Sequence, residues 1–448
     1  MTRLIQKIIS ALFRDKQDEG HFSKYLIKNS VQLFSLHCAS LGLGFLSNYV
    51  LIRVVGINDY GLYVYIFNLL YLLANFCLAG TDSLLIKEIS VYDDAAKYEE
   101  LKGVIFFGIT VAFFGSLIVS FASEMIITFT SFKTDLRNFN WIILSVFSLL
   151  MLSAIGIGQA SLQALRKIIL SHLAEKIVRP VLFTILVLGI FHVQKKAGIT
   201  DLIRINLAAI AVTLLVTFIF FKKSISPKLK GVKPKFDVTG WSYSTIGFFL
   251  LGGVYILNSR VDIFLLGIFK GNGEVGTYNI VLKISETISF GIGIVNFVLA
   301  PFIAKLFANN ETTQLQLLIT RAARIVIFFS LPLVIAIFFL RGNILNFFRA
   351  DFFNSRTALL ILCCGQLVNI LFGSVGTLLM MTGNQKFSIY ALAVGTSFNI
   401  VFNIVLTPKY GIVGTAIATT GSLIIWNLLM YLFVRKRIGI YPTAFKIV

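Results

Sequence analysis

Charged residues are scarce in this sequence. Asp, Glu, Lys and Arg make up only 13% of its 448 residues, about half of their usual share in soluble proteins, whereas hydrophobic residues make up 57%. A helix that spans a bilayer takes about 20 apolar residues, so this composition accommodates twelve spans and leaves no stretch for a separate soluble catalytic or nucleotide-binding domain. No removable signal peptide is visible before the first expected span. We therefore expect an all-α integral membrane protein.

Residues that build reactive or metal sites are also few. The four cysteines all fall in apolar runs, which indicates core or lipid-facing residues and not a disulfide framework. The four histidines lack metal-ligand spacing, and neither G-x-x-x-x-G-K-[ST] nor G-x-S-x-G occurs. Gly271–Gly276 matches G-x-G-x-x-G, but no strand precedes it, so we interpret it as a turn. We expect no cofactor, no metal site and no enzyme activity.

Apolar runs separated by charged or turn-forming clusters predict the membrane spans. They lie near residues 28–52, 61–81, 103–123, 140–160, 172–193, 202–221, 242–267, 276–303, 324–340, 358–381, 387–407 and 412–434. The Lys and Arg residues outside the spans concentrate on the side of the N-terminus, which predicts that both termini are cytoplasmic. Topology therefore explains the net charge of +20, and we expect no nucleic acid partner.

A basic segment divides the expected spans into two sets of six. Residues 222–240 hold six lysines together with Pro227 and Pro234, which interrupt helices, so they predict an extended cytoplasmic linker. The expected parts are a cytoplasmic lead-in (1–27), an N-terminal six-helix bundle (28–221), the linker, a C-terminal six-helix bundle (241–434) and a cytoplasmic tail (435–448). Apolar residues at helical spacing in Arg3–Phe13 fit either a short amphipathic helix on the inner leaflet or an ordinary lead-in.

A motif of the form acid-x-Gly-x-Tyr occurs once in each half, as Asp59–Tyr63 after the first span and as Glu274–Tyr278 after the seventh. Gly198–Ile199 before the sixth span is echoed by Gly411–Ile412 before the twelfth, at nearly the same offset. Either pair alone could arise by chance, but together they indicate duplicated halves. Because each half has an even number of spans, their pseudo-twofold axis is expected along the membrane normal, with the substrate path between the halves.

Charged side chains inside apolar spans cost about 2.5–3.5 kcal/mol on insertion scales, so each is a candidate for the transport path. Arg260 and Asp262 lie two residues apart in the seventh span and face different sides of the helix, so they cannot simply neutralise each other. Arg260 fits two interpretations, a cavity-facing side chain and one that snorkels to the interface. Lys283 and Glu286, three residues apart in the eighth span, form either a self-neutralising pair or a cationic contact beside a protonatable carboxylate.

Three further charged residues lie near span ends. Asp82 is near the inner end of the second span, close to Lys87, where a structural role is slightly favoured. Arg53 ends the first span on the outer side, and Arg179, followed by Pro180, opens the fifth span near the inner side. Both arginines can snorkel to the interface or bind phosphate at a portal.

Three stretches carry a family pattern: Arg53–Glu88, Asn258–Tyr278 and Asn399–Ala416. With them, the chain resembles the polysaccharide-unit (O-antigen and exopolysaccharide, Wzx-type) flippases of the multidrug/oligosaccharidyl-lipid/polysaccharide exporter superfamily over nearly its whole length. The motifs are loose in sequence, so they indicate the transporter class far better than the cargo.

The resemblance implies a fold like that of the multidrug and toxin exporters (MATE), with two six-helix bundles. It also implies a flippase that moves an undecaprenyl-pyrophosphate-linked oligosaccharide from the inner to the outer leaflet of a bacterial inner membrane. A glycan polymerase and a chain-length regulator are candidate partners, beside the lipid-linked oligosaccharide and membrane lipids.

The resemblance also suggests roles for the charged residues. Cationic cavity residues would pair with the pyrophosphate, and the candidates are Arg53, Arg260, Lys283 and Arg179. Antiport of H⁺ or Na⁺ would need a carboxylate, and the candidates are Glu286, Asp262 and Asp82.

The main alternative is a multidrug exporter of the same superfamily, which would hold cationic drugs in a net acidic cavity. The candidate carboxylates, Asp82, Asp262 and Glu286, are few, and Arg260 and Lys283 stand against them, so the preference for an anionic cargo rests on a small count. A lipid II flippase of the same superfamily usually has two additional spans, which are not among those expected here. A symporter of the major facilitator class would show a Gly-x-x-x-Asp-Arg-like loop after the second span, but this chain has Lys87–Asp94 there. A membrane glycan polymerase or ligase would need a larger outer loop than the longest one here, from about Arg341 to Thr357.

Overall fold

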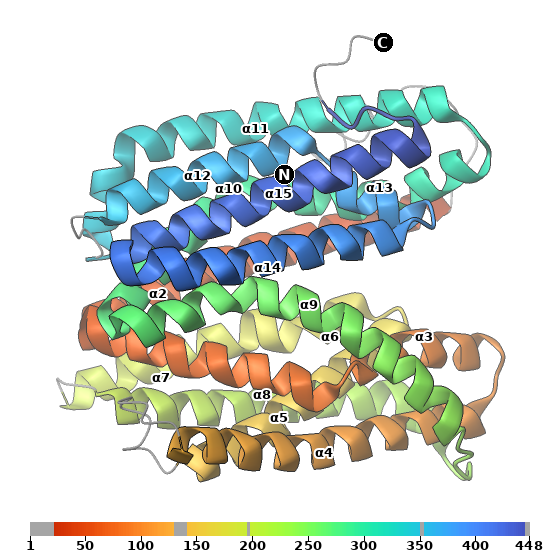
Figure 1. Ribbon diagram of the computed structural model, residues 1–448. Coiled ribbons are helices and arrows are strands. Elements are labelled where there is room, and N and C mark those ends of the chain that lie inside the picture. The colour runs from red at the N-terminus through yellow and green to blue at the C-terminus, as the bar shows by residue number, and fades with distance from the viewer. Residues whose placement is uncertain (1–21, 130–140, 195–197, 350–353, 444–448) are drawn as a thin grey trace. The chain divides into compact units, whose positions relative to one another are not determined.

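The computed structural model describes residues 22–129, 141–194, 198–349 and 354–443, and this part of the chain is helical apart from turns and short connectors (Figure 1). The expected all-α class is confirmed. Nine of the described helices are long and apolar enough to cross a membrane, or ten if the bent helix α9 is one span. Each expected span overlaps a described helix. The amphipathic lead-in expected at residues 3–13 lies outside the described residues.

The chain divides into two compact units. The first is Leu36–Arg260, and the second is Val261–Val448 together with the N-terminal residues up to Ser35. Helices α2 (Phe22–Leu78) and α9 (Val238–Lys270) each contribute to both units. The first unit also contains α3 (Thr81–Asp94), α4 (Tyr98–Phe129), α5 (Trp141–Ala164), α6 (Ile168–Leu173), η2 (Ala174–Val178), α7 (Arg179–Gln194) and α8 (Ile199–Leu229). The second contains α10 (Asn272–Ala308), α11 (Thr312–Phe347), α12 (Ser355–Phe372), α13 (Val375–Met381), α14 (Gln385–Tyr410) and α15 (Ile412–Ile438).

Helix α2 contains the first two expected spans. Its 57 residues would extend about 85 Å if straight, far beyond the roughly 30 Å of bilayer hydrocarbon. Gly56 breaks the helix with φ 82° and ψ 172°, a backbone conformation that is essentially restricted to glycine. One continuous apolar stretch thereby becomes two spans.

A π-helical turn, η2, lies between α6 and α7, and Pro180 follows it closely. Proline has no amide proton, and in an α-helix its ring would clash with the carbonyl group four residues earlier, here that of Lys176. The wider turn makes room for the ring, and the Arg179 amide donates to the carbonyl of Ala174, five residues back. This turn therefore sets the directions in which Lys176 and Arg179 leave the helix.

The basic linker differs from the sequence prediction. Helix α8 continues through Pro227 to Leu229, so the expectation that Pro227 ends the helix is wrong. Pro227 removes one backbone hydrogen bond, the one that its amide would donate to the Lys223 carbonyl, and α8 ends two residues later. The extended part spans residues 232–237, where the Lys235 amide donates to the Glu99 carbonyl at 3.0 Å and the Lys235 ammonium donates to Glu100 at 3.0 Å. This hydrogen bond raises the pKa of Lys235.

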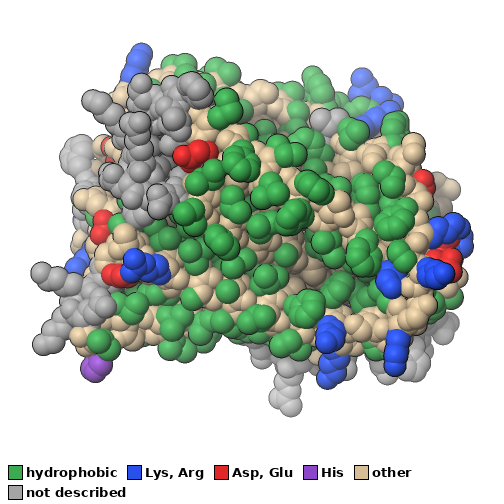
Figure 2. All heavy atoms as spheres, turned by 90° about the horizontal axis from the view of Figure 1, so that it is seen from below, with side chains coloured by type: hydrophobic (Ala, Val, Ile, Leu, Met, Phe, Trp, Pro, Cys, Tyr) green, Lys and Arg blue, Asp and Glu red, His purple; other side chains and the backbone are tan. Residues whose placement is uncertain are grey.

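The molecule exposes many large apolar side chains, as expected of a surface in contact with lipid. Hydrophobic side chains fill the middle of the face drawn in Figure 2, and Lys and Arg side chains gather toward its margins. The exposed apolar residues of α4 are Phe106, Ile109, Phe113, Phe114, Ile118, Phe121 and Met125. Such a surface matches the hydrocarbon layer between two polar interfaces.

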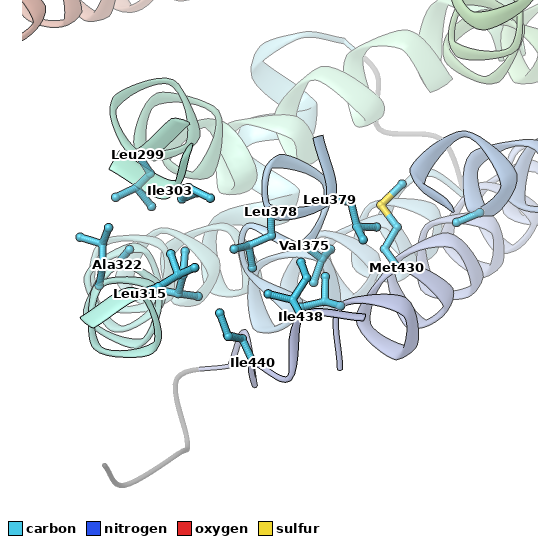
Figure 3. Packing of buried hydrophobic residues seen from close by; sticks show 14 residues of the cluster. Leu299, Ile303, Leu315, Ala322, Val375, Leu378, Leu379, Met430, Ile438 and Ile440 are labelled. Atoms are coloured by element: carbon cyan, nitrogen blue, oxygen red, sulfur yellow. The ribbon is translucent and has the colours of Figure 1, made fainter. Parts of the chain in front are cut away.

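The second unit closes one end of its core with the segment after α15. Side chains from α10, α11, α13 and α15 converge there, including the fully buried Leu378, and Ile440 joins them (Figure 3). Gln316 on α11 holds this segment by two hydrogen bonds, because its amide nitrogen donates to the Tyr441 carbonyl at 2.7 Å and its oxygen accepts from the Tyr441 amide at 2.8 Å.

Candidate functional site

A buried guanidinium lies in the interior of the first unit. Arg179, at the start of α7, is only 9% exposed and donates through Nη2 to Oδ1 of Asn206 on α8 at 2.8 Å. Its guanidinium carbon lies 5.1 Å from the ring centre of Tyr71. Asn206 in turn donates to the Tyr63 hydroxyl at 2.7 Å, and the Tyr63 ring stacks on Phe183. The partners of this cation are an amide and an aromatic ring.

A buried carboxylate lies in the interior of the second unit. Asp262 is 3% exposed, and its Oδ2 accepts hydrogen bonds from the Tyr278 hydroxyl at 3.0 Å and from Thr419 on α15 at 3.5 Å. Its Oδ1 accepts from the Ile263 amide at 2.8 Å. The hydroxyl groups of Tyr278 and Thr419 are themselves 3.0 Å apart. These three donors are two hydroxyl groups and a backbone amide.

A ladder of polar side chains runs between α14 and α15 in the same unit. Asn403 donates to Oδ1 of Asn399 at 2.6 Å, and Thr407 donates to Oδ1 of Asn403 at 2.9 Å. Thr407 also lies 3.0 Å from Thr415, which is one turn before Thr419 on α15. All four ladder residues are buried, and the pattern of apolar runs gave no signal for them.

The two acid-x-Gly-x-Tyr motifs each direct a tyrosine into the polar interior of their own unit. Tyr63 joins the network of Arg179, and Tyr278 binds Asp262. In the second unit Glu274 also reaches the other repeated motif, because its Oε2 accepts from the Ile412 amide at 3.0 Å. This contact holds the start of α15, and with it Thr419, against the start of α10.

The other predicted cationic residues lie in varied surroundings. Arg260 is half-buried and donates to Oδ1 of Asn68 on α2 within the first unit. Arg53 is exposed, with its guanidinium 5.3 Å from the ring centre of Tyr49. Lys283 is half-buried on α10 of the second unit.

The remaining predicted carboxylates are more accessible than Asp262. Glu286 on α10 is exposed. Asp82, in the first turn of α3, is half-buried and lines a small cavity of about 40 Å³ with Asn75 and Gly252, which has room for only a few water molecules. Lys87, the expected neighbour of Asp82, forms an ion pair with Glu88 at 3.0 Å. No group of three or more His, Cys, Asp or Glu side chains gathers in a metal-binding arrangement in the described part of the chain.

Sequence reasoning missed one cationic contact within a span. Nζ of Lys176, in η2, lies 2.6 Å from Nε2 of His37 on α2. The two residues are 139 positions apart, so no local pattern connects them. The available signal was that Lys176 falls inside the apolar stretch Ile168–Val193.

Two family models match this chain. The model of the polysaccharide biosynthesis protein family matches residues 26–307, which is more than half of the chain. The chain belongs to this family. The MatE model also matches, over residues 254–405.

Two relatives of this family member differ in how much they share with it. An uncharacterized membrane protein of Methanocaldococcus jannaschii is 25% identical over 408 residues, which cover 84% of this chain and 78% of the relative. A probable low-salt glycan biosynthesis flippase of Haloferax volcanii is 22% identical over 197 residues, which cover 44% of this chain and 40% of the relative. The second similarity is therefore partial on both sides.

Solved structures confirm the expected fold. An inward-facing multidrug resistance MATE transporter superposes with a TM-score of 0.68 at 15% identity, covering 89% of this chain and 94% of its own. The lipid II flippase MurJ, in an inward closed conformation, superposes with a TM-score of 0.69 at 18% identity, covering 90% and 87%. The family member thus has the fold of the multidrug/oligosaccharidyl-lipid/polysaccharide exporter superfamily.

Proposed function

We propose that this membrane protein is a flippase that moves a lipid-linked oligosaccharide across the membrane by alternating access. The observation that carries the proposal is the buried guanidinium of Arg179, whose partners are an amide and an aromatic ring. A permanent positive charge inside a membrane-spanning unit favours an anionic cargo. Membership of the polysaccharide biosynthesis protein family and the similarity to a glycan biosynthesis flippase support the same cargo class.

The proposed cargo is an undecaprenyl-pyrophosphate-linked oligosaccharide, carried outward across a bacterial inner membrane by a chain with cytoplasmic termini. The lipid tail stays in the bilayer while the sugar head crosses. A pyrophosphate carries about two negative charges, which Arg53, Arg260, Lys283 and Arg179 are candidates to offset. An inside-negative potential favours outward movement of an anion by roughly 2.3 kcal/mol per charge per 100 mV.

Ion coupling would use the second unit. Asp262 is a buried carboxylate inside a membrane-spanning unit, where a charge is costly, so uptake of a proton or Na⁺ would reduce that cost. Glu286 and Asp82 remain further candidates for this role. Uptake from one side of the membrane and release to the other would link the ion gradient to the change in access.

A multidrug exporter is the second candidate function. The match of the MatE model to residues 254–405 favours it, and a buried carboxylate suits a cationic drug. The two functions predict cargoes of opposite charge, so they can be separated by experiment.

The test is a deletion strain of the source organism, assayed for surface polysaccharide and for lipid-linked repeat units retained on the cytoplasmic side. Wild type, Arg260→Lys and Arg260→Ala are returned to it. Accumulated repeat units and loss of surface glycan, rescued by wild type and Arg260→Lys but not by Arg260→Ala, are the expected results. Normal surface glycan with increased sensitivity to cationic dyes would support the exporter instead.

A further inference from the structure

A basic cluster, defined as His37, His172 and Lys176, lies within the first unit. Lys176 Nζ is 2.6 Å from His37 Nε2, and His172 on α6 lies within electrostatic reach of both. An ammonium group has only protons to offer, so His37 accepts this hydrogen bond through Nε2 and its ring is neutral in this arrangement. Side chains from α2 and η2 thus bring two nitrogen atoms into contact, and His172 on α6 is near enough for both to act on it electrostatically.

The neighbouring charged groups are already engaged. Glu175 is the carboxylate within electrostatic reach of Lys176, and its Oε2 accepts from Gln159 Nε2 at 2.7 Å. Arg179, three residues after Lys176, donates to Asn206, which bonds to the Tyr63 hydroxyl. Because Glu175 already accepts from Gln159, it offsets the positive charge of Lys176 only in part.

The cluster lies within a membrane span, where burying the Lys176 ammonium costs free energy unless an anionic ligand offsets its charge. Lys176 is eight residues after Ile168, the start of a candidate span, which corresponds to a depth of about 12 Å. Lysine and histidine at such depths are usually paired or mark a transport pathway. The π turn before Pro180 determines where Lys176 points, and π turns occur frequently at functional sites.

We propose that His37, His172 and Lys176 bind the phosphate groups of the lipid-linked cargo. This site rests on the proposed flippase function and adds residues to it that sequence reasoning did not identify. The ligand chemistry is a lipid-bound phosphate, which a polyprenyl pyrophosphate and an ordinary phospholipid both offer. Phosphate oxygens accept charge-assisted hydrogen bonds from an ammonium and from imidazolium rings.

The site predicts a pH dependence of binding. When phosphate oxygens replace His37 as the acceptor for Lys176, the imidazole rings can bind the phosphate only as donors, and a doubly protonated ring donates through both nitrogens. Binding therefore tightens as the pH falls from 8 to 6. Glu175, which acts electrostatically on Lys176, and Arg179, which is linked through Asn206 to Tyr63, are the other ionisable groups near the cluster.

Binding of radiolabelled farnesyl pyrophosphate to the full chain, purified in detergent, tests the site. Equilibrium dissociation constants are measured at pH 6 and pH 8 for wild type, Lys176→Gln and Lys176→Arg. The double variant His37→Gln with His172→Gln separates titration of the cluster from titration of the ligand. Lys97→Gln, which removes an exposed lysine far from the cluster in sequence, is the control for net charge.

We expect binding at least tenfold weaker in Lys176→Gln, within threefold of wild type in Lys176→Arg, and unchanged in Lys97→Gln. The double histidine variant should weaken binding and lose most of the tightening at pH 6. Unchanged affinity in both Lys176→Gln and the double variant, each melting like wild type, would overturn the site. If one of them fails to fold, the other decides.

Competition with unlabelled lipids distinguishes the two phosphate sources. Farnesyl pyrophosphate should displace the label at concentrations at least tenfold below those of phosphatidylglycerol, and equal displacement would overturn the assignment to the cargo. A different result would contradict the proposed flippase function. If the deletion strain makes normal surface glycan while the Lys176 variants still lose binding, the site stands and the flippase does not.

Discussion

The two units carry the same acid-x-Gly-x-Tyr motif but bury opposite charges. In the first unit Tyr63 belongs to the network that holds the guanidinium of Arg179, and in the second Tyr278 donates to the carboxylate of Asp262. The backbone motif is shared, while the charged partner comes from a different helix in each unit.

This difference separates two tasks. Arginine stays protonated at any pH that a protein experiences, so the charge of the first unit is permanent. A carboxylate can be neutralised by a proton or a metal cation, so the charge of the second unit can switch. We therefore expect cargo binding to depend on the first unit and ion coupling on the second.

The largest expected effect comes from Arg179→Met. Methionine keeps the length of the side chain but leaves Oδ1 of Asn206 without its donor, so the free energy of unfolding should fall by about 1–3 kcal/mol. Transport of the lipid-linked oligosaccharide should fall at least tenfold, because the permanent charge is gone. Export in the complemented deletion strain and thermal unfolding in detergent measure the two quantities. Arg179→Lys, which keeps the positive charge, is the control and should export more than Arg179→Met. Full export by Arg179→Met would show that transport does not depend on the charge in the first unit.

Asp262→Asn should abolish the response to an ion gradient. The amide keeps the shape of the side chain and can still accept hydrogen bonds from Tyr278 and Thr419, but it cannot be neutralised by a cation. We expect transport in proteoliposomes to become about tenfold slower under an imposed H⁺ or Na⁺ gradient and equal to its rate without one. A gradient response like that of wild type would place the coupling elsewhere, and Glu286→Gln would then be the next variant to measure.

The repeated glycines offer a matched pair. Gly411 has φ 55° and ψ −134°, which favours glycine, and a methyl group there would overlap the Glu274 carboxylate that holds Ile412. Gly198 has φ −105°, and a methyl group there would meet only Oγ1 of Thr200, at 4.0 Å. Gly411→Ala should therefore reduce stability by about 1–3 kcal/mol, and Gly198→Ala should leave it nearly unchanged. Denaturant or thermal unfolding measures both, and equal losses would contradict the structural difference.

The smallest expected effect is the difference between the two tyrosines. Tyr278→Phe removes a hydrogen bond to a carboxylate, which contributes about 1.5–3 kcal/mol, whereas Tyr63→Phe removes one from a neutral amide, which contributes about 0.5–1.5 kcal/mol. The second unit should thus be more sensitive to loss of the hydroxyl. Unfolding measurements on both variants give the two losses of free energy. A greater loss in Tyr63→Phe than in Tyr278→Phe would contradict the prediction.

Much of the fold was predictable because membrane insertion depends on local composition. Apolar runs in the sequence predicted every described helix that is long and apolar enough to cross a membrane. Arg179 and Asp262 were recognisable as charged residues within those runs. The prediction at Pro227 was wrong because α8 continues past the one backbone hydrogen bond that this proline removes. Helix α3 was not predicted, because the expected second span ends at residue 81 and the charged segment Lys87–Asp94 was interpreted as a loop.

The partners of the charged groups could not be predicted. Asn68 is 192 residues from Arg260, and Thr419 is 157 residues from Asp262. Asparagine and threonine occur at many other positions within the expected spans, so their residue types do not single out these two. The contact between His37 and Lys176 could not be predicted for the same reason, because the two residues are 139 positions apart.

By itself, the sequence determined that this protein is helical and membrane-embedded, with two halves that carry repeated motifs, because hydropathy and backbone conformation act over short stretches of chain. The tertiary structure decided that one unit encloses a cation and the other an anion, and which neutral side chains hold each of them. Those contacts join helices far apart in the chain, and their energy depends on distance and burial, which exist only once the helices have packed.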